Sequence, residues 1–284
     1  MQPKHILDRV ILIICTAMVG GCISPAPQVD VGQEARVARD PAALMRIGDA
    51  AAASGDAATA STFYQRAVAL QPASVSAALG AAGSLSREGR VDEAITVLQQ
   101  ALTHVPIADR TRISLVLGRL LVLTHRPVDA ISVFREAVAR DPHDVSVLIG
   151  LGVALEGSHD VAGAQDAYRR ALAANPDNVA ATNDLALSRA LQGETGPASD
   201  ALHALRTTIL RTGRDDAALA TVDGNLALVS AMQGRMRDAA RYGADATPGP
   251  GELSDNMRFY SVLRPAGDAS GAGDRSGLSP AGAD

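Results

Sequence analysis

The stretch that decides the fold is residues 145–176, VSVLIGLGVALEGSHDVAGAQDAYRRALAANP. Apolar residues recur at helical spacing on both sides of a short polar break at His159 and Asp160, and the stretch ends at a proline. Apolar residues three and four positions apart indicate an amphipathic helix, and a proline ends one. The stretch therefore predicts two helices joined by a tight turn.

This helix-turn-helix pattern repeats along the chain. Prolines at Pro72, Pro106, Pro142 and Pro176 are separated by 34, 36 and 34 residues. When each proline is placed at position 32 of a unit of about 34 residues, five units begin at Pro41, Val75, Thr111, Val145 and Val179, and a degenerate sixth begins near Ala220. One helix pair cannot bury its own apolar stripe, so neighbouring units must stack.

Small residues recur at certain positions of each unit, and large residues recur at others. Position 8 is Gly48, Ala82, Gly118, Gly152 and Ala186, and position 20 is Ala60, Ala94, Ala130, Ala164 and Ala198. Position 24 is Tyr64, Leu98, Phe134, Tyr168 and Leu202. The pattern resembles the tetratricopeptide repeat (TPR) over residues 41–210, and more loosely over 220–243. The resemblance implies an all-α fold: a TPR α-solenoid over 41–246, with five clear helix-turn-helix repeats and a degenerate C-terminal sixth repeat as a cap.

The composition excludes several classes of function. Alanine makes up roughly a fifth of the chain, which favours closely packed helices. With no Trp, three Phe and four Tyr, the chain is not built as an aromatic platform for bases or sugars. The formal net charge of −5 gives no general basic surface, so we expect no nucleic-acid partner.

The N-terminus has the features of an export signal. Lys4 and Arg9 precede an apolar run of about ten residues, which is too short to span a membrane and typical of a signal peptide. The run ends Val19-Gly20-Gly21-Cys22, which resembles the lipobox of bacterial lipoproteins. The alternative is an ordinary secretory signal with a chance cysteine. The resemblance implies a signal peptide over 1–21 and lipidation of Cys22.

The resemblance to lipoproteins also implies a location. Ile23 and Ser24 follow the cysteine where an aspartate would favour retention in the inner membrane, so we expect an outer-membrane protein that is lipid-anchored and faces the periplasm. Residues 22–40, with two prolines near their start, are predicted to be a flexible tether. Residues 247–284 are predicted to be a disordered tail, in which the apolar segment 257–263 either partly collapses or docks on the last repeat or a partner.

Motifs for chemistry are missing. The six histidines form no His-Glu-x-x-His motif, and no Gly-x-Ser-x-Gly elbow occurs. Gly150 and Gly152 open a predicted helix with no strand before it, so we interpret them as packing residues rather than a dinucleotide loop. We therefore expect no enzyme, no cofactor, no metal site and no small-molecule substrate. A cryptic enzyme acting on cell-wall peptides is the contrary hypothesis.

The resemblance to TPR proteins implies a concave groove lined by positions 2, 5, 9, 12 and 13 of the first helices. Here its middle is apolar and edged by charged residues, which suits an apolar helix or strand of a protein partner. The alternative is that neighbouring helices cover some of these residues. The predicted peptide-binding groove comprises Met45, Leu79, Arg87, Arg112, Leu115, Arg119, Val122, Ile149, Val153, Glu156, Asn183 and Leu187.

A lipoprotein built of repeats is similar in layout to the TadD-type lipoproteins of tight-adherence (Flp) pilus systems. That resemblance implies a non-enzymatic scaffold that assists assembly of a Flp or type IV pilus or a secretion apparatus, as a pilotin does for a secretin. Its partners would be the secretin or other pilus-assembly components. The alternative is a general cell-envelope scaffold, an adaptor for peptidoglycan hydrolases or for β-barrel assembly.

Overall fold

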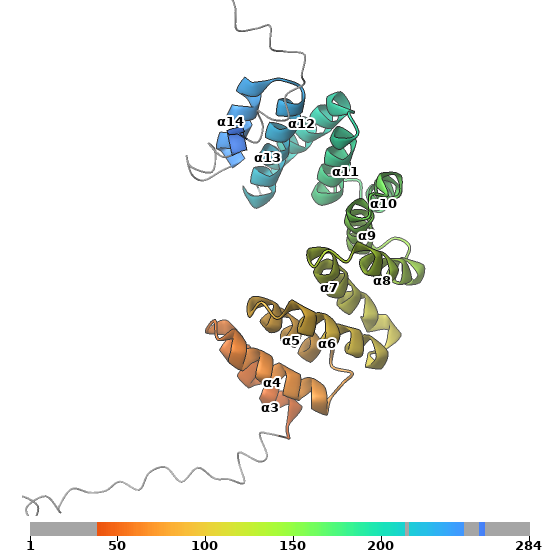
Figure 1. The fold of residues 1–284 in the computed structure, drawn as a ribbon, viewed down its shortest axis with the longest axis vertical. Coiled ribbons are helices and arrows are strands. Elements are labelled where there is room, and N and C mark those ends of the chain that lie inside the picture. The colour runs from red at the N-terminus through yellow and green to blue at the C-terminus, as the bar shows by residue number, and fades with distance from the viewer. Residues whose placement is uncertain (1–38, 214–215, 247–255, 259–284) are drawn as a thin grey trace, which may run out of the picture.

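The computed structural model describes residues 39–213, 216–246 and 256–258, and over these residues it is an array of antiparallel helix pairs that bends into an open C (Figure 1). The predicted signal peptide, Cys22, the tether up to residue 38 and nearly all of the predicted tail lie outside the described residues. The fold predicted from the repeats, an all-helical solenoid, is confirmed.

Each repeat supplies one pair of helices. The first four pairs are α3 (Pro41–Ala53) with α4 (Ala57–Leu70), α5 (Val75–Arg87) with α6 (Val91–His104), α7 (Arg110–Leu123) with α8 (Pro127–Arg140), and α9 (Val145–Gly157) with α10 (Val161–Ala174). The last two pairs are α11 (Val179–Leu191) with α12 (Thr195–Thr212), and α13 (Asp216–Met232) with α14 (Met236–Ala246). The longer spacing between Pro106 and Pro142 is accommodated by a short 3₁₀ turn, η2 (Ile107–Asp109).

The helix ends follow from local sequence. Ser74, Asp144 and Asn178 each precede a first helix, and each side chain accepts a hydrogen bond from a backbone N–H of the first turn. The second helices α4, α8 and α10 end two residues before a proline. The fifth repeat has Leu210 where that proline would stand, and α12 runs on to Thr212.

The turn inside each repeat needs one residue in the left-handed region. Gly55, Gly89, Gly193 and Gly234 occupy it with positive φ, which glycine adopts without steric cost. In the third and fourth repeats the same position is held by His125 (φ 57°) and His159 (φ 66°). Their shared repeat position thus has a backbone explanation.

The core is divided along the solenoid. One large cluster of buried residues runs from Ala78 to Leu185, and a second runs from Ala186 to Tyr242. The division falls on α11, which contributes to both clusters. Met257, in the C-terminal segment, packs against the second cluster.

Candidate protein-binding groove

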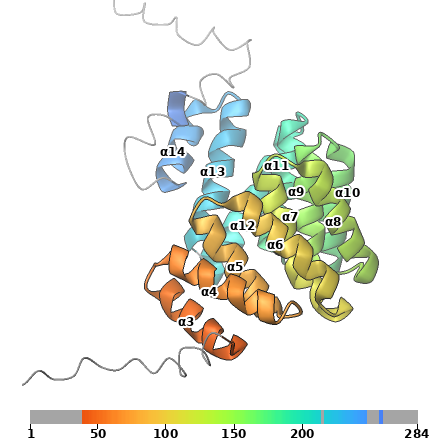
Figure 2. The ribbon, with the colours of Figure 1, turned by 60° about the horizontal axis from the view of Figure 1, so that its bottom comes forward.

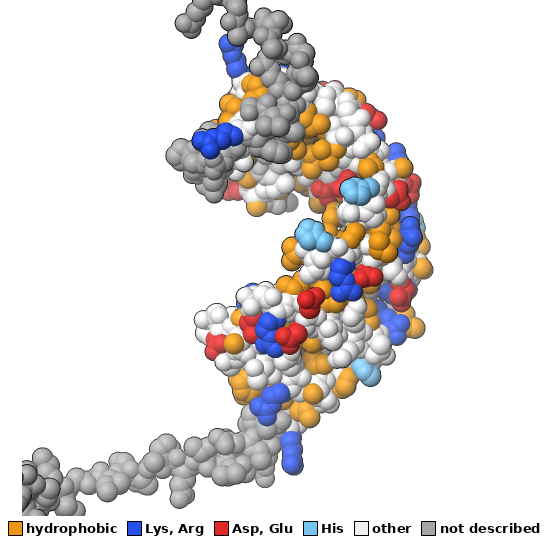
Figure 3. Space-filling view, viewed as in Figure 1, with side chains coloured by type: hydrophobic (Ala, Val, Ile, Leu, Met, Phe, Trp, Pro, Cys, Tyr) orange, Lys and Arg blue, Asp and Glu red, His pale blue; other side chains and the backbone are white. Residues whose placement is uncertain are grey.

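The first helices form the inner side of the curve. Neighbouring first helices such as α5, α7 and α9 contact one another, whereas the second helices contact their counterparts less. In both ribbon views α8 and α10 lie on the side of α7 and α9 that faces away from α13 (Figures 1 and 2). The inner side opens as a wide recess between the two ends of the array (Figure 3).

A cleft of about 330 Å³ lies on this inner side, between α7, α9 and α11. Helix α7 contributes Arg119 and Val122, and α9 contributes a row of residues one or two turns apart. The complete lining is Arg119, Val122, Phe134, Ser146, Ile149, Gly150, Val153, Asn178 and Ala180. The lining is mainly apolar with polar groups at its edges, as in sites that hold a side chain of a ligand.

The floor of this cleft depends on two glycines. The Phe134 ring is fully buried, and a Cβ built on Gly118 or Gly150 would lie 2.3 Å or 2.6 Å from its nearest ring atom. The ring therefore rests on position 8 of its own repeat and position 6 of the next. Tyr64 makes the same contact with Gly48 and Gly80. Gly150 lies against Phe134, and Gly152 lies against Tyr168. Both contacts fit the interpretation of these two glycines as packing residues.

The predicted groove residues differ in how much of them a partner could reach. Arg87, Arg112, Arg119 and Val153 are exposed, the last with 37% of its surface. Those that are half-buried are Met45, Leu79, Leu115, Val122, Ile149, Glu156 and Leu187. Of these, Leu79, Leu115, Val122 and Ile149 also pack against the main buried cluster. A substitution at Leu115 would therefore disturb the core as well as the groove.

Asn183 is in a different environment from the rest of the set. It is only 6% exposed, and its Oδ1 accepts a hydrogen bond of 2.8 Å from Nδ2 of Asn225 on α13. Its own Nδ2 donates to Oδ1 of Asp184 at 3.2 Å. Asn183 thus joins α11 to α13 and is not open to a partner. The sequence could not indicate this, because the sixth repeat is degenerate at the positions that would reveal the contact.

Two tyrosine hydroxyls hold carboxylates at the edge of the inner side. Tyr168 donates to Oε2 of Glu156 at 3.1 Å, and Tyr64 donates to Oδ1 of Asp49 at 2.7 Å. Burial, with the neighbouring carboxylate, raises the pKa of Tyr64 to about 12 and that of Tyr168 further still. Both tyrosines therefore remain protonated donors at neutral pH.

The sequence missed part of the cleft lining. Phe134, Gly150 and Asn178 stand at positions that were not predicted to line it, and Ser146 and Ala180, at position 2, are not among the predicted groove residues. Position 6 carried a usable signal, because Gly80 and Gly150 both stand there and a helix-interior glycine usually has a packing reason. Within the described ranges, no group of three or more His, Cys, Asp or Glu side chains could hold a metal ion.

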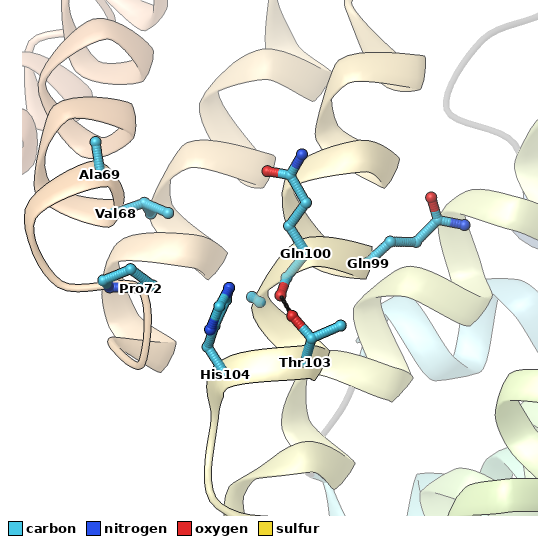
Figure 4. A pocket seen from close by; sticks show the side chains of 8 residues that line it. Val68, Ala69, Pro72, Gln99, Gln100, Thr103 and His104 are labelled. Carbon is cyan, nitrogen blue, oxygen red and sulfur yellow. Dashed lines mark hydrogen bonds between the residues drawn. The ribbon is translucent and has the colours of Figure 1, made fainter.

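A second recess of about 570 Å³ lies on the outer side, between the C-terminal parts of α4 and α6 (Figure 4). Gln99, Gln100, Thr103 and His104 line it and are all exposed. Thr103 donates its hydroxyl to the carbonyl oxygen of Gln100 at 2.7 Å. Val68, Ala69 and Pro72 form the α4 side of this recess, opposite the polar side chains of α6.

Comparison with known families decides the repeat type. Tetratricopeptide repeat models match residues 121–181 in one case, and residues 45–106 and 79–145 in another. Residues 45–181 are tetratricopeptide repeats. The TPR fold is generally that of a scaffold for protein–protein interactions. No curated protein sequence is significantly similar to this chain.

Solved TPR structures share the architecture. PilW, a type IV pilus biogenesis factor, aligns with a TM-score of 0.59 and 21% identity over 76% of this chain and 97% of its own. PilF of Pseudomonas aeruginosa aligns with a TM-score of 0.55 and 18% identity over 77% of this chain and 97% of its own. The matched chain of the APC/C hetero-tetramer Cut9–Hcn1 aligns with a TM-score of 0.60 and 19% identity over 78% of this chain. The alignment covers only 43% of that longer chain. At these identities the likeness establishes the fold alone.

None of the described helices is long and apolar enough to cross a bilayer.

Proposed function

We propose that this TPR protein is lipid-anchored at Cys22 to the outer membrane and uses its concave face to bind a component of a Flp or type IV pilus or secretion apparatus. Its task would be to help a secretin assemble and reach its place, with no catalysis of its own. The observation that carries the proposal is the apolar cleft between α7, α9 and α11, where Val153 is 37% exposed.

Three further features support the proposal. Almost the whole of PilW and of PilF, 97% of each chain, aligns with this solenoid. The small residues before Cys22 match the processing pattern of lipoproteins, and acyl chains would hold the solenoid stably at a membrane surface. The recess on the inner side is large enough to be reached by a partner (Figure 3).

The partner is tested by cross-linking and capture of the tagged full-length chain from its native membranes, read by mass spectrometry. We expect secretin and pilus-assembly proteins with the wild type and loss of them with Val153→Asp, which puts a charge into the cleft. Ala162→Asp, at an exposed position of α10, is the matched control and should capture the same proteins as the wild type. Capture of hydrolases or barrel-assembly proteins without a secretin would instead favour the general envelope scaffold.

The anchor is tested separately by metabolic labelling with an alkyne fatty acid. The wild type should be labelled and Cys22→Ser should not. Equal labelling of the two chains, or no labelling of either, would contradict lipidation at this residue.

A further inference from the structure

The charges around the central cleft are unevenly distributed. Arg119 lines the cleft, and Arg112 stands seven residues earlier on α7, which is two turns along the same helix face. Both are exposed. On the other bank, Glu156 follows Ile149 by seven residues on α9, with Val153 between them. The apolar cleft thus has cations on α7 and an anion near the end of α9.

The two arginines on α7 are available to a partner. Neither Arg112 nor Arg119 makes a hydrogen bond or an ion pair with any residue that the structure describes. Arginines at the turns behave differently, since Arg90 pairs with Glu93 and Arg126 with Asp129 inside the same repeat. Cations left without a partner beside an apolar cleft lose no interaction when an external carboxylate binds them.

Glu156 is fixed in place on the opposite bank. It is half-buried, and the hydroxyl of Tyr168 donates to its Oε2 at 3.1 Å. A carboxylate held in this way keeps lone pairs free to accept from a basic side chain of a ligand. It also disfavours an acidic group next to it, because like charges placed side by side cost free energy.

We propose that the partner segment is an acidic amphipathic peptide. A large aliphatic or aromatic side chain of this peptide fills the cleft between Val122, Ile149 and Val153. Asp or Glu residues beside that anchor pair with Arg119 and Arg112, and any basic residue lies toward Glu156. The inference rests on the proposed role of the concave face and adds the chemistry of what it binds.

The dimensions suit a helical segment. Seven residues of α-helix span about 10 Å, so Arg112 to Arg119 and Ile149 to Glu156 each cover two turns. A partner helix lying along the groove repeats the same rise, and its residues i and i+7 can face both charges of one bank. At about 330 Å³, the cleft is at the lower end of the range for small-ligand pockets, about 300–1,000 Å³, which suits a side chain rather than a whole cofactor.

The test is a selection from a phage library of random 16-residue peptides against the purified full-length chain. We expect the selected peptides to be rich in Asp or Glu next to Leu, Ile or Phe. Their affinity should fall at least about tenfold with Arg119→Glu and fall with added salt, since exposed ion pairs are screened. Arg135→Glu, at an exposed position of α8, is the matched control and should bind as the wild type does.

A charge swap makes the test specific. A selected peptide with its Asp or Glu residues replaced by Lys should lose affinity for the wild type and regain it for Arg119→Glu. Selection of basic peptides, of peptides indifferent to Arg119→Glu, or of none above background would overturn the inference. If acidic peptides are selected but no secretin is captured from membranes, the pilus role fails and the inference stands. If a secretin is captured equally well by Arg119→Glu, the inference fails and the role stands.

Discussion

The middle repeats and the C-terminal repeats bury different chemistry. In the middle of the array large residues at position 24 rest on small residues of first helices: Phe134 on Gly118 and Gly150, and Tyr168 on Gly152. From α11 to α14 a buried amide and a buried carboxylate also join helices, Asn183 to Asn225 and Asp223 to Arg206, whereas the buried polar side chains of α5 to α10 are serines, Ser84 and Ser114. The middle is held by shape, and the end is held by directional polar contacts.

The reason lies in the position of the last repeat. Among the described residues it has another repeat on one side only, so it buries less apolar surface against other repeats than a middle repeat does. Arg206 on α12 compensates by pairing with the buried Asp223 on α13 and, at 3.1 Å, with Asp245 on α14. His203 and the Tyr242 hydroxyl share a hydrogen bond of 2.8 Å that also links α12 to α14. Removing a contact of either kind tests this contrast.

The largest expected effect is at the glycine under Phe134. In Gly118→Ala the new Cβ would lie 2.3 Å from Cζ of the fully buried Phe134 ring. Overpacking of this kind should cost about 3 kcal/mol of stability, at the upper end of its usual range. Chemical denaturation measures the loss, and hydrogen exchange should place it in α7–α9. Gly83→Ala is the control, since nothing lies within 4 Å of its Cβ, and it should stabilise α5 by about 0.5–1 kcal/mol.

The second repeat supplies a rescue for that variant. It pairs Ala82 at position 8 with Leu98 at position 24, and both are buried. Gly118→Ala with Phe134→Leu should therefore be less destabilised than the sum of the two single changes. A purely additive double variant would mean that the contact between ring and glycine does not hold the middle repeats together.

The second effect is at the buried ion pair. Asp223→Ala should cost about 2 kcal/mol, because Arg206 keeps only its exposed partner Asp245 after the loss of a charged hydrogen bond. Hydrogen exchange should speed up in α12–α14 and stay unchanged in α5–α8. Asp238→Ala, which removes the exposed pairs with Arg241 and Arg235, should cost less than about 0.5 kcal/mol. Faster exchange throughout the solenoid would contradict the division at α11.

The sequence predicted the middle repeats better than the end for a physical reason. Small residues at positions 8 and 20 and large ones at 24 are steric requirements, so they are visible as columns such as Gly118, Ala130 and Phe134. The polar contacts at the end depend on single pairs distant in sequence, such as Asn183 with Asn225, which no column shows. The cleft was predicted only in part. The residues that the next repeat contributes to it, such as Asn178 and Ala180, depend on how neighbouring helices pack, which the sequence of one repeat does not show.

A smaller effect concerns the turn inside the repeats. His159 adopts φ 66° where Gly193 of the next repeat adopts φ 90°. Relief of the left-handed conformation, about 1–2 kcal/mol, exceeds the extra chain entropy that a glycine loses on folding, about 0.5–1 kcal/mol. His159→Gly should therefore stabilise the fourth repeat by about 0.5–1 kcal/mol in thermal denaturation. Gly193→His is the reciprocal change, and a gain there would refute the account.

The smallest effect tests where the polar end begins. Position 6 is Gly80 and Gly150 in two repeats but Asp184 in the fifth, where it faces Tyr168 and Glu156. Burial, with a further contribution from Glu156, raises the pKa of Asp184 above its usual 3.8, and the hydrogen bond from Asn183 offsets this only in part. An acid whose pKa is higher in the folded chain than in the unfolded chain makes stability fall as the pH rises between the two values.

Asp184→Asn removes that titration and can still accept from Asn183 through its amide oxygen. The variant should therefore be more stable than the wild type at pH 7, and the difference should shrink toward pH 3.5, because protonation of Asp184 removes the buried charge. Thermal denaturation at the two pH values measures it, with the exposed Asp166→Asn as the control. An equal difference at both pH values would mean that packing, and not the cost of burying a charge, separates this junction from the apolar repeats before it.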